Sequence, residues 1–276
     1  SLQHLRKRFL SLLQYFFTLL DKTSLVTAVR SQLAGYKVGD RSLYRQVFRP
    51  LMTPDFMYTQ VMAQPPLQGE QLEIYTRGGS EVTIYRKPGD IKLLYHLYPP
   101  EFKLTEDAYT LLELARTVLA EHKPRQEEFL DPQRMRTTFF NIGRDLLQEL
   151  ADHKHISLDY QQIEQLAAIL VRYTVGFGLL EVLLQDERVQ DIFVNGPVGQ
   201  TPIFIVHQDY GECVTNILPS REDSESWATK LRLLSGRPLD EANPVLDTEL
   251  SIPGARSRVA VVTFPLSPVG LSFSLR

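Results

Sequence analysis

The sequence is poor in cysteine, with Cys213 the single one among its 276 residues. One thiol cannot form a disulfide framework within the chain, and it cannot supply a cysteine-rich zinc site. We interpret Cys213 as a half-buried strand residue, which is an ordinary environment for a free thiol. A chain without disulfides is compatible with the cytosol.

An excess of positive charge is also lacking. The 30 lysine and arginine residues are outnumbered by 33 aspartate and glutamate residues, giving a net charge of -3 and a pI of about 6.1. Proteins that bind nucleic acid usually present a basic footprint. We therefore expect no nucleic-acid partner.

Motifs of catalysis and metal binding are missing from the sequence. It contains no Gly-x-x-x-x-Gly-Lys-Ser/Thr, no Gly-x-Ser-x-Gly and no His-Glu-x-x-His. The chain as given should therefore not hydrolyse ATP, and no catalytic residue is assigned to it. His153 and His155 lie near a predicted helix end, but a metal site would need further ligands close by. We interpret them as exposed loop histidines and expect no metal site.

No stretch is long enough and apolar enough to span a bilayer. Residues 2–20 begin with Arg6-Lys7-Arg8 and continue as an apolar run, which mimics a signal peptide. However, Ser11, Gln14 and Thr18 form a polar stripe at helical spacing, and a span needs about 20 apolar residues. The pattern predicts an amphipathic helix. Its apolar face could contact a protein core, a membrane surface or a partner, and the sequence does not decide among these three alternatives.

Residues 1–100 are predicted to form a helix-plus-meander unit. Two further short helices are expected over residues 25–33 and 42–52. Alternating apolar and polar residues then predict strands over 71–77 and 81–86, joined by a Gly78-Gly79 turn, and a third strand over 92–98.

Residues 101–178 are predicted to form a helical connector. Its helices are expected from Thr105 to about Lys123, from Pro132 past Leu150, and from Leu158 to about Tyr173, each with an apolar stripe. Gly176-Phe177-Gly178 should end the third helix, and this segment is too short to be a dinucleotide-binding fingerprint.

Residues 179–276 are predicted to form the third unit. Strands are expected over 189–194, 202–206 and 212–217, followed by a helix capped at Ser220, and by two last strands over 258–264 and 271–276. This order indicates an α+β fold with an antiparallel sheet and a helix across one face. Asp186, Glu187 and Asp191 are interpreted as a solvated strand end.

Arginines gather near the end of the chain, at Arg237, Arg256, Arg258 and Arg276. A hairpin of the last two strands would bring Arg258 and Arg276 to one edge of the sheet, where two guanidinium groups could hold a phosphate. The alternative is a salt-bridged or solvated edge, and the pattern alone leaves both open.

The acidic residues around these arginines also have two interpretations. They are Asp240, Glu241, Asp247 and Glu249. They could cap and satisfy loop backbone groups, as aspartate commonly does, or they could anchor the neighbouring arginines.

Four segments together carry a resemblance to a known family. They are Val175-Gly-Phe-Gly-Leu-Leu-Glu-Val-Leu-Leu-Gln-Asp, Val189-Gln-Asp-Ile-Phe-Val-Asn-Gly, Gly236-Arg-Pro-Leu-Asp-Glu-Ala-Asn-Pro and the pattern from Arg258-Val-Ala-Val-Val to Leu-Ser-Phe-Ser-Leu-Arg276. Residues 100–276 thereby resemble the amino-terminal half of the type II/type IV secretion ATPase superfamily, in particular its archaeal pilus, archaellum and secretion branch. Residues 1–100 carry no such resemblance.

The resemblance implies a division into domains and a set of site residues. It implies a docking domain over 1–100, a helical connector over 101–178 and a PAS-like domain over 179–276, ahead of a RecA-like motor domain that this chain lacks. In the family, the PAS-like domain lends arginines to ATP bound by the motor. The matching positions are Arg258 and Arg276, with Arg256 and Arg237 as possible helpers.

The resemblance also implies partners and a location. It implies a homo-hexamer whose neighbouring subunits and own motor domain contact this region, and a membrane platform protein bound through residues 1–100. ATP and Mg²⁺ would bind the full-length protein and not this fragment, which the resemblance places in the cytoplasm at the inner face of the cell membrane. The alternative function is a stand-alone PAS-like sensor or protein-interaction module.

Overall fold

The computed structural model describes residues 2–23, 26, 57, 59–62, 64–66, 69–121 and 132–276. The chain divides into two compact units, residues 1–51 and residues 52–276. Each unit is described here by itself. The helices predicted over 25–33 and 42–52 lie outside the described residues, apart from Val26.

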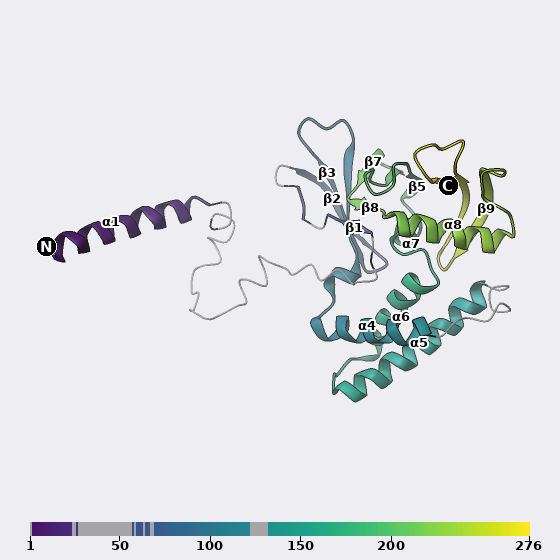
Figure 1. The fold of residues 1–276 in the computed structure, drawn as a ribbon, viewed down its shortest axis with the longest axis horizontal. Helices are drawn as coiled ribbons and strands as arrows, with labels where there is room; N and C mark the ends of the chain where they lie inside the picture. Colours follow the sequence, from purple (N-terminus) through teal and green to yellow (C-terminus); the bar gives the residue numbers. More distant parts are fainter. Residues whose placement is uncertain are drawn as a thin grey trace. The chain divides into compact units, whose positions relative to one another are not determined.

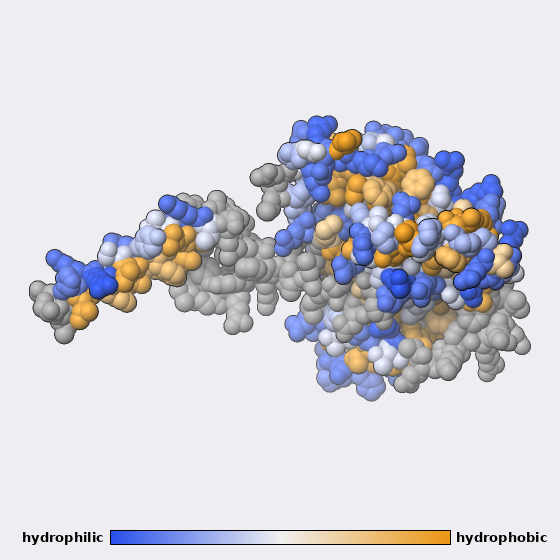
Figure 2. All heavy atoms as spheres, turned by 45° about the horizontal axis from the view of Figure 1, so that its top comes forward, coloured by the Kyte–Doolittle hydropathy of each residue, from blue (hydrophilic) through white to orange (hydrophobic). Residues whose placement is uncertain are grey.

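The described part of the first unit is mainly one helix, α1 (Leu2–Asp21), as predicted (Figure 1). One side of it is lined by large apolar side chains that are exposed to solvent, which Figure 2 shows as an orange strip. They are Leu5, Phe9, Leu10, Leu12, Tyr15, Phe16, Phe17, Leu19 and Leu20. Among the described residues, no helix has the length and apolar character needed to cross a membrane.

The second unit is built on a nine-stranded sheet with the order β2-β3-β4-β7-β6-β5-β11-β10-β9. Its strands are β2 (Glu70–Arg77), β3 (Ser80–Arg86), β4 (Leu93–Tyr98), β5 (Val189–Val194), β6 (Phe204–His207), β7 (Gly211–Thr215), β9 (Val245–Ile252), β10 (Ala255–Val262) and β11 (Ser272–Leu275). A separate two-stranded ladder pairs β1 (Gln60–Val61) with β8 (Ile217–Leu218). With its helices, this unit has an α+β fold, as predicted.

The helices of the second unit form two groups. A 3-10 turn, η2 (Pro100–Lys103), leads to α4 (Glu106–Glu121), α5 (Pro132–Lys154) and α6 (Tyr160–Thr174), which pack on one another. The other group, α7 (Leu179–Leu184) and α8 (Arg221–Ser235), packs on the sheet. Trp227 of α8 meets Phe273 of β11 edge to face, with 5.9 Å between ring centroids.

The strands that precede the predicted helical connector in the sequence and those that follow it belong to one sheet. β4 pairs with β7 in parallel, with Leu94 opposite Val214, whereas the other pairings among the described strands of this sheet are antiparallel. The predicted boundary near residue 100 therefore does not separate two sheets. A parallel pairing between segments more than 100 residues apart leaves no local trace in the sequence.

Asp186, which follows α7 in the chain, contacts residues of β2 and β4. The residue is 1% exposed, and its carboxylate accepts hydrogen bonds from the Tyr75 and Tyr95 hydroxyls, at 2.7 and 2.8 Å. The interpretation of Asp186 as part of a solvated strand end was therefore wrong. Its neighbour Glu187 is exposed, as expected. The meander strands β2 and β4 bring the two tyrosines over Asp186, and no local pattern reveals this.

Other local predictions can be compared with the structure directly. Ser220 caps α8 by accepting the Asp223 amide at 3.0 Å, and His153 and His155 are exposed, as predicted, although His153 belongs to α5 and not to a loop. Cys213 lies in β7 but is fully buried instead of half-buried. The break after α6 falls at 175–178, where Gly178 has a φ of 60°.

Candidate functional site

The candidate site lies on β10 and β11, where Arg258 and Arg276 stand directly opposite each other. The Arg258 amide donates to the Arg276 carbonyl at 2.9 Å, and the Arg276 amide donates to the Arg258 carbonyl at 3.0 Å. Residues that exchange both bonds in an antiparallel pair carry their side chains on the same face of the sheet. The structure thus brings together the two arginines that the sequence analysis singled out, but it places them on and directly after the inner strands β10 and β11 and not at an edge of the sheet.

Acidic residues flank the two arginines on the neighbouring strands. Glu249 of β9 is opposite Arg258, and Asp191 of β5 lies one position beyond the pairing of Ile192 with Leu275. Asp191, Arg276, Arg258 and Glu249 therefore form one row across four strands, which we call the charged row. Two like charges at its centre are held between two opposite charges at its ends.

Ion pairs orient both arginine side chains. Arg258 binds Asp247 through two nitrogens, at 3.1 and 2.5 Å, and Arg276 donates from Nε to Asp191 at 2.7 Å. The hydrogen bond and charge of Arg258 hold the pKa of Asp247 below its usual value, and the hydrogen bond and charge of Asp247 raise the pKa of Arg258. The Arg276 pKa is likewise raised by Asp191. Asp247 and Asp191 therefore anchor these arginines, which was one of the two interpretations of the acidic cluster for Asp247.

Asp240, another acidic residue of that cluster, acts differently. Asp240 accepts the Ala242 and Asn243 amides and the Asn243 side chain within 3.0 Å. It therefore satisfies loop backbone groups, the other interpretation offered by the sequence.

Both helper candidates lie near the charged row. Arg256 is two residues before Arg258 on β10, hence on the same face, and is exposed. Arg237 donates to the Asp247 carbonyl at 2.9 Å. Asp247 therefore contacts two arginines, one through its carboxylate and one through its backbone.

The two faces of this part of the sheet differ sharply. Val259, Phe273 and Leu275 alternate with the arginines and are at most 2% exposed, facing the core. The Arg258 and Arg276 side chains are 74% and 82% exposed. Exposed ion pairs contribute only about 0–1 kcal/mol, so an incoming anion can compete for these arginines at low cost. The arrangement suits recognition of a multiply charged anion, because guanidinium groups bind phosphate oxygens in a fixed geometry.

The carboxylates at the candidate site serve to hold its arginines. Within the part of the chain that the structure describes, no group of three or more His, Cys, Asp or Glu side chains could hold a metal ion. The nearest carboxylates, Asp247 and Asp191, are engaged by arginine.

The sequence analysis missed one partner within the candidate site and one cavity outside it. The first is Asp191 as the partner of Arg276, because β5 and β11 are far apart in the sequence and their pairing has no local signal. The second is a cavity away from the charged row, lined by Arg136 and Lys230. A lysine in the apolar stripe of a helix was a usable signal for it, because Lys230 lies between Trp227 and Leu234.

Comparisons with known proteins give archaeal relatives without an assigned function. No family model matches the chain. Three proteins of Methanocaldococcus jannaschii are similar to parts of it, and all three are named as uncharacterized. MJ1288 is 31% identical over 39% of this chain and 42% of its own length.

The other two matches cover smaller shares of longer proteins. MJ0781 is 30% identical over 48% of this chain and 18% of its own length. MJ0900 is 35% identical over 46% of this chain and 22% of its own length. The matched stretches thus span less than half of each of these relatives.

Proposed function

We propose that this chain is the N-terminal regulatory and assembly region of a hexameric ATPase that powers type II secretion or the assembly of a type IV pilus or archaellum. The observation that carries the proposal is the pair Arg258 and Arg276, two exposed guanidinium groups directly opposite each other on a sheet face. In this proposal, they contact the triphosphate of ATP held by a RecA-like motor domain outside this chain.

The chemistry follows from the charge of the reacting group. Phosphoryl transfer spreads negative charge over the phosphate oxygens, and a positioned arginine stabilises that charge in the transition state. Asp247 and Asp191 would hold the two side chains extended before ATP arrives, which reduces the cost of ordering them. Mg²⁺ would be held by the motor domain, because the described residues of this chain present no ligand cluster for it.

Movement of this region against the motor would convert hydrolysis into force. Closure on ATP would engage the arginines, and release of the products would disengage them. The archaeal origin of the three similar proteins agrees with the proposed branch of the family.

The first helix supports a peripheral position at the inner face of the membrane. α1 has a continuous apolar side, the basic residues Arg6, Lys7 and Arg8 near its start, and no acidic residue before Asp21. Such helices lie in the interface of membranes that carry anionic lipids. In this proposal, α1 rests on the membrane surface next to the platform protein that residues 1–100 bind.

Vesicle sedimentation tests the role of α1. The chain should sediment with anionic phosphatidylglycerol vesicles, and Phe9→Ser with Phe16→Ser should abolish this, whereas Gln14→Ser in the polar stripe should not. Equal sedimentation of the wild type and the double variant would contradict the membrane role. Capture of the platform protein by α1 without vesicles would assign the apolar side to that protein instead.

The coding sequence beyond Arg276 tests the larger proposal. A Gly-x-x-x-x-Gly-Lys-Ser/Thr encoded within about 50 residues would support the motor assignment, because this motif cradles the phosphates of ATP. A stop codon there would favour a stand-alone ligand-binding or interaction module. The cavity between α5, α6, α8 and β9 is the observation that favours this second function.

A further inference from the structure

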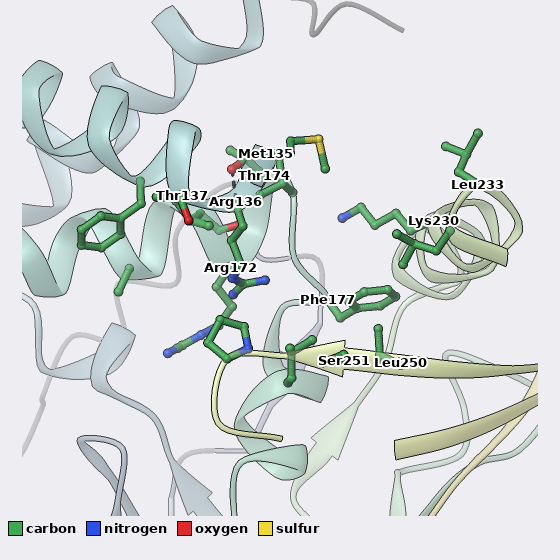
Figure 3. A pocket seen from close by; sticks show the side chains of 17 residues that line it. Met135, Arg136, Thr137, Arg172, Thr174, Phe177, Lys230, Leu233, Leu250 and Ser251 are labelled. Atoms are coloured by element: carbon green, nitrogen blue, oxygen red, sulfur yellow. Dashed lines mark hydrogen bonds between the residues drawn. The ribbon is translucent and has the colours of Figure 1, made fainter. Parts of the chain in front are cut away.

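A cavity of about 710 Å³ lies between the helical group α5–α6 and the sheet-packed elements α8 and β9 (Figure 3). Its walls are largely apolar, with Met135 and Phe140 from α5, Leu233 from α8, and Leu250 and Ile252 from β9. Leu233 is 58% exposed, so a large apolar side chain faces solvent at this cavity. A volume between about 300 and 1,000 Å³ with apolar walls and a few polar groups is typical of small-molecule sites.

Arg136 supplies the first polar group of the cavity. It donates two hydrogen bonds to the carboxylate of Glu181, at 2.8 and 2.5 Å. Glu181 is fully buried and also accepts the Phe177 amide at 2.9 Å. The carboxylate oxygens are thus occupied, whereas a guanidinium carries five N–H donors. Arg136 keeps donors for a second acceptor.

Lys230 supplies the second polar group. Figure 3 shows it reaching from α8 toward the side of the cavity that carries Met135, Thr174 and Arg136. Within the described residues, Lys230 donates one hydrogen bond, to the Gly176 carbonyl, and forms no ion pair with a carboxylate. An ammonium has three donors, so two remain for a ligand.

The environment of Lys230 disfavours its charge. Burial, with a smaller contribution from the nearby Arg136, lowers the pKa of Lys230 to about 8, although Glu181 of α7 and Asp223 of α8 oppose this shift. A bound anion would offset the cost of burial, because an opposite charge favours the ammonium form.

The third cation of the cavity is already neutralised. Arg172 of α6 pairs with the buried Glu101 at 2.5 Å. With Arg136 balanced by Glu181, Lys230 leaves the cavity with one positive charge that no carboxylate of the cavity wall balances. An apolar space with a single excess cation suits a ligand that has one acidic group and an apolar body.

We propose that this cavity binds a small amphipathic anion, with its carboxylate or phosphate group at Lys230 and Arg136 and its apolar body between α5, α8 and the end of β9. The ligand would contact both the helical group and the sheet-packed elements. It would therefore stabilise their arrangement by the free energy of its binding. This site is separate from the charged row and does not depend on the proposed ATPase function.

Calorimetric titration of the 276-residue chain with decanoate and with monodecyl phosphate tests the proposal. At least one of the two should bind at micromolar to submillimolar concentration, and neutral decanol should bind about tenfold or more weakly, because hydrogen bonds to charged groups are the stronger ones. Comparison of the affinities for decanoate and monodecyl phosphate identifies whether the site prefers a carboxylate or a phosphate group.

Three variants assign the binding to the cavity. Lys230→Met keeps the side-chain length but removes the charge, and should weaken binding about tenfold. Ala168→Phe should fill the cavity from an exposed position on α6 and abolish binding. Arg232→Met removes a charge from the exposed side of α8, two residues from Lys230, and should leave the affinity unchanged. Thermal unfolding of each variant without ligand establishes that it is folded.

The same titrations define the contrary results. Absence of binding by both anions, or equal affinity in wild type, Lys230→Met and Ala168→Phe, would overturn the proposal. If the wild type is a dimer and Ala168→Phe is a monomer, a second copy of the chain fills the cavity. That result would also overturn the proposal. With decanoate, the affinity of the wild type should fall as the pH rises above 8, and this dependence should be lost in Lys230→Met.

Discussion

Arg258 and Arg276 exchange both of their backbone hydrogen bonds, at 2.9 and 3.0 Å, which fixes two cationic side chains next to each other on an exposed sheet face. The backbone hydrogen bonds set the two residues opposite each other, and the ion pairs with Asp247 and Asp191 orient their side chains. Their mutual repulsion is limited by solvent and by the flanking Asp191 and Asp247. Function, rather than stability, is therefore the better reason for this pairing.

The first prediction follows from that exposure. Arg258→Ala and Arg276→Ala should each change the free energy of unfolding by about 0.5 kcal/mol or less, because exposed ion pairs contribute little. Urea unfolding followed by circular dichroism measures this. A loss of several kcal/mol would mean that the arginines are structural elements of the sheet.

The second prediction concerns Asp186 and its neighbour. Asp186→Ala should destabilise the second unit by about 3 kcal/mol, because it leaves the hydroxyls of Tyr75 and Tyr95 without their shared buried acceptor. Glu187→Ala is the matched control, since this residue is exposed and makes only a 3.5 Å ion pair with Arg77. Equal urea midpoints for the two variants would contradict the role assigned to Asp186.

The third prediction concerns Gly176, which lies in the bend between α6 and α7. A Cβ there would contact Glu181 Oε1 and would lie 2.7 Å from the Arg172 carbonyl oxygen. Gly176→Ala should therefore cost about 1–3 kcal/mol of unfolding free energy and disturb the Arg136–Glu181 pair. Gly236→Ala is the comparison, because its Cβ would meet nothing within 4 Å and only its φ of 65° is strained. A smaller loss for Gly176→Ala than for Gly236→Ala would contradict this account.

The fourth prediction concerns pH and His207. Its Nδ1 accepts the Asp209 amide at 3.1 Å, which leaves the proton on Nε2 to donate to the Tyr75 hydroxyl at 3.2 Å. Burial lowers the pKa of His207, with Arg188 acting in the same direction and Asp186, Asp209 and Glu73 opposing it. His96 is shifted the same way, also by burial.

The sign of the effect follows from these shifts. In the unfolded chain these histidines bind a proton near pH 6.5, whereas in the folded chain they do so only at lower pH. The unfolding free energy is therefore at its highest above pH 6.5 and falls as the pH decreases. His207→Asn, which keeps an acceptor for the Asp209 amide, should reduce the loss of stability between pH 7 and 5. His153→Asn, at an exposed position, should not. An unchanged pH slope in His207→Asn would refute the assignment.

Local patterns in the sequence predicted much of the fold. The glycine turn at 78–79, the alternation on either side of it, and the cap at Ser220 each depend on neighbouring residues, and the structure has the strands β2 and β3 and the helix α8 there. The placement of Arg258 opposite Arg276 also followed from a short hairpin. The short sequence separation limits the number of possible registers.

Strand pairings between segments that are far apart in the sequence could not be predicted from local patterns. The parallel contact of β4 with β7 and the contact of β5 with β11 depend on the whole chain. Asp186 was consequently misplaced in solvent, and the partnership of Asp191 with Arg276 was missed. The cavity was missed for the same reason, because its walls come from α5, α6, α8 and β9.

The central claim is that Arg258 and Arg276 act on ATP, and steady-state hydrolysis by the full-length protein encoded by the gene tests it most directly. Arg258→Ala and Arg276→Ala should each lower kcat by about 10³-fold or more, the usual range for an arginine at the transferred phosphate. Arg86→Ala, which removes an exposed, ion-paired arginine from β3, should retain wild-type turnover. Wild-type turnover in both Arg258→Ala and Arg276→Ala would contradict the account.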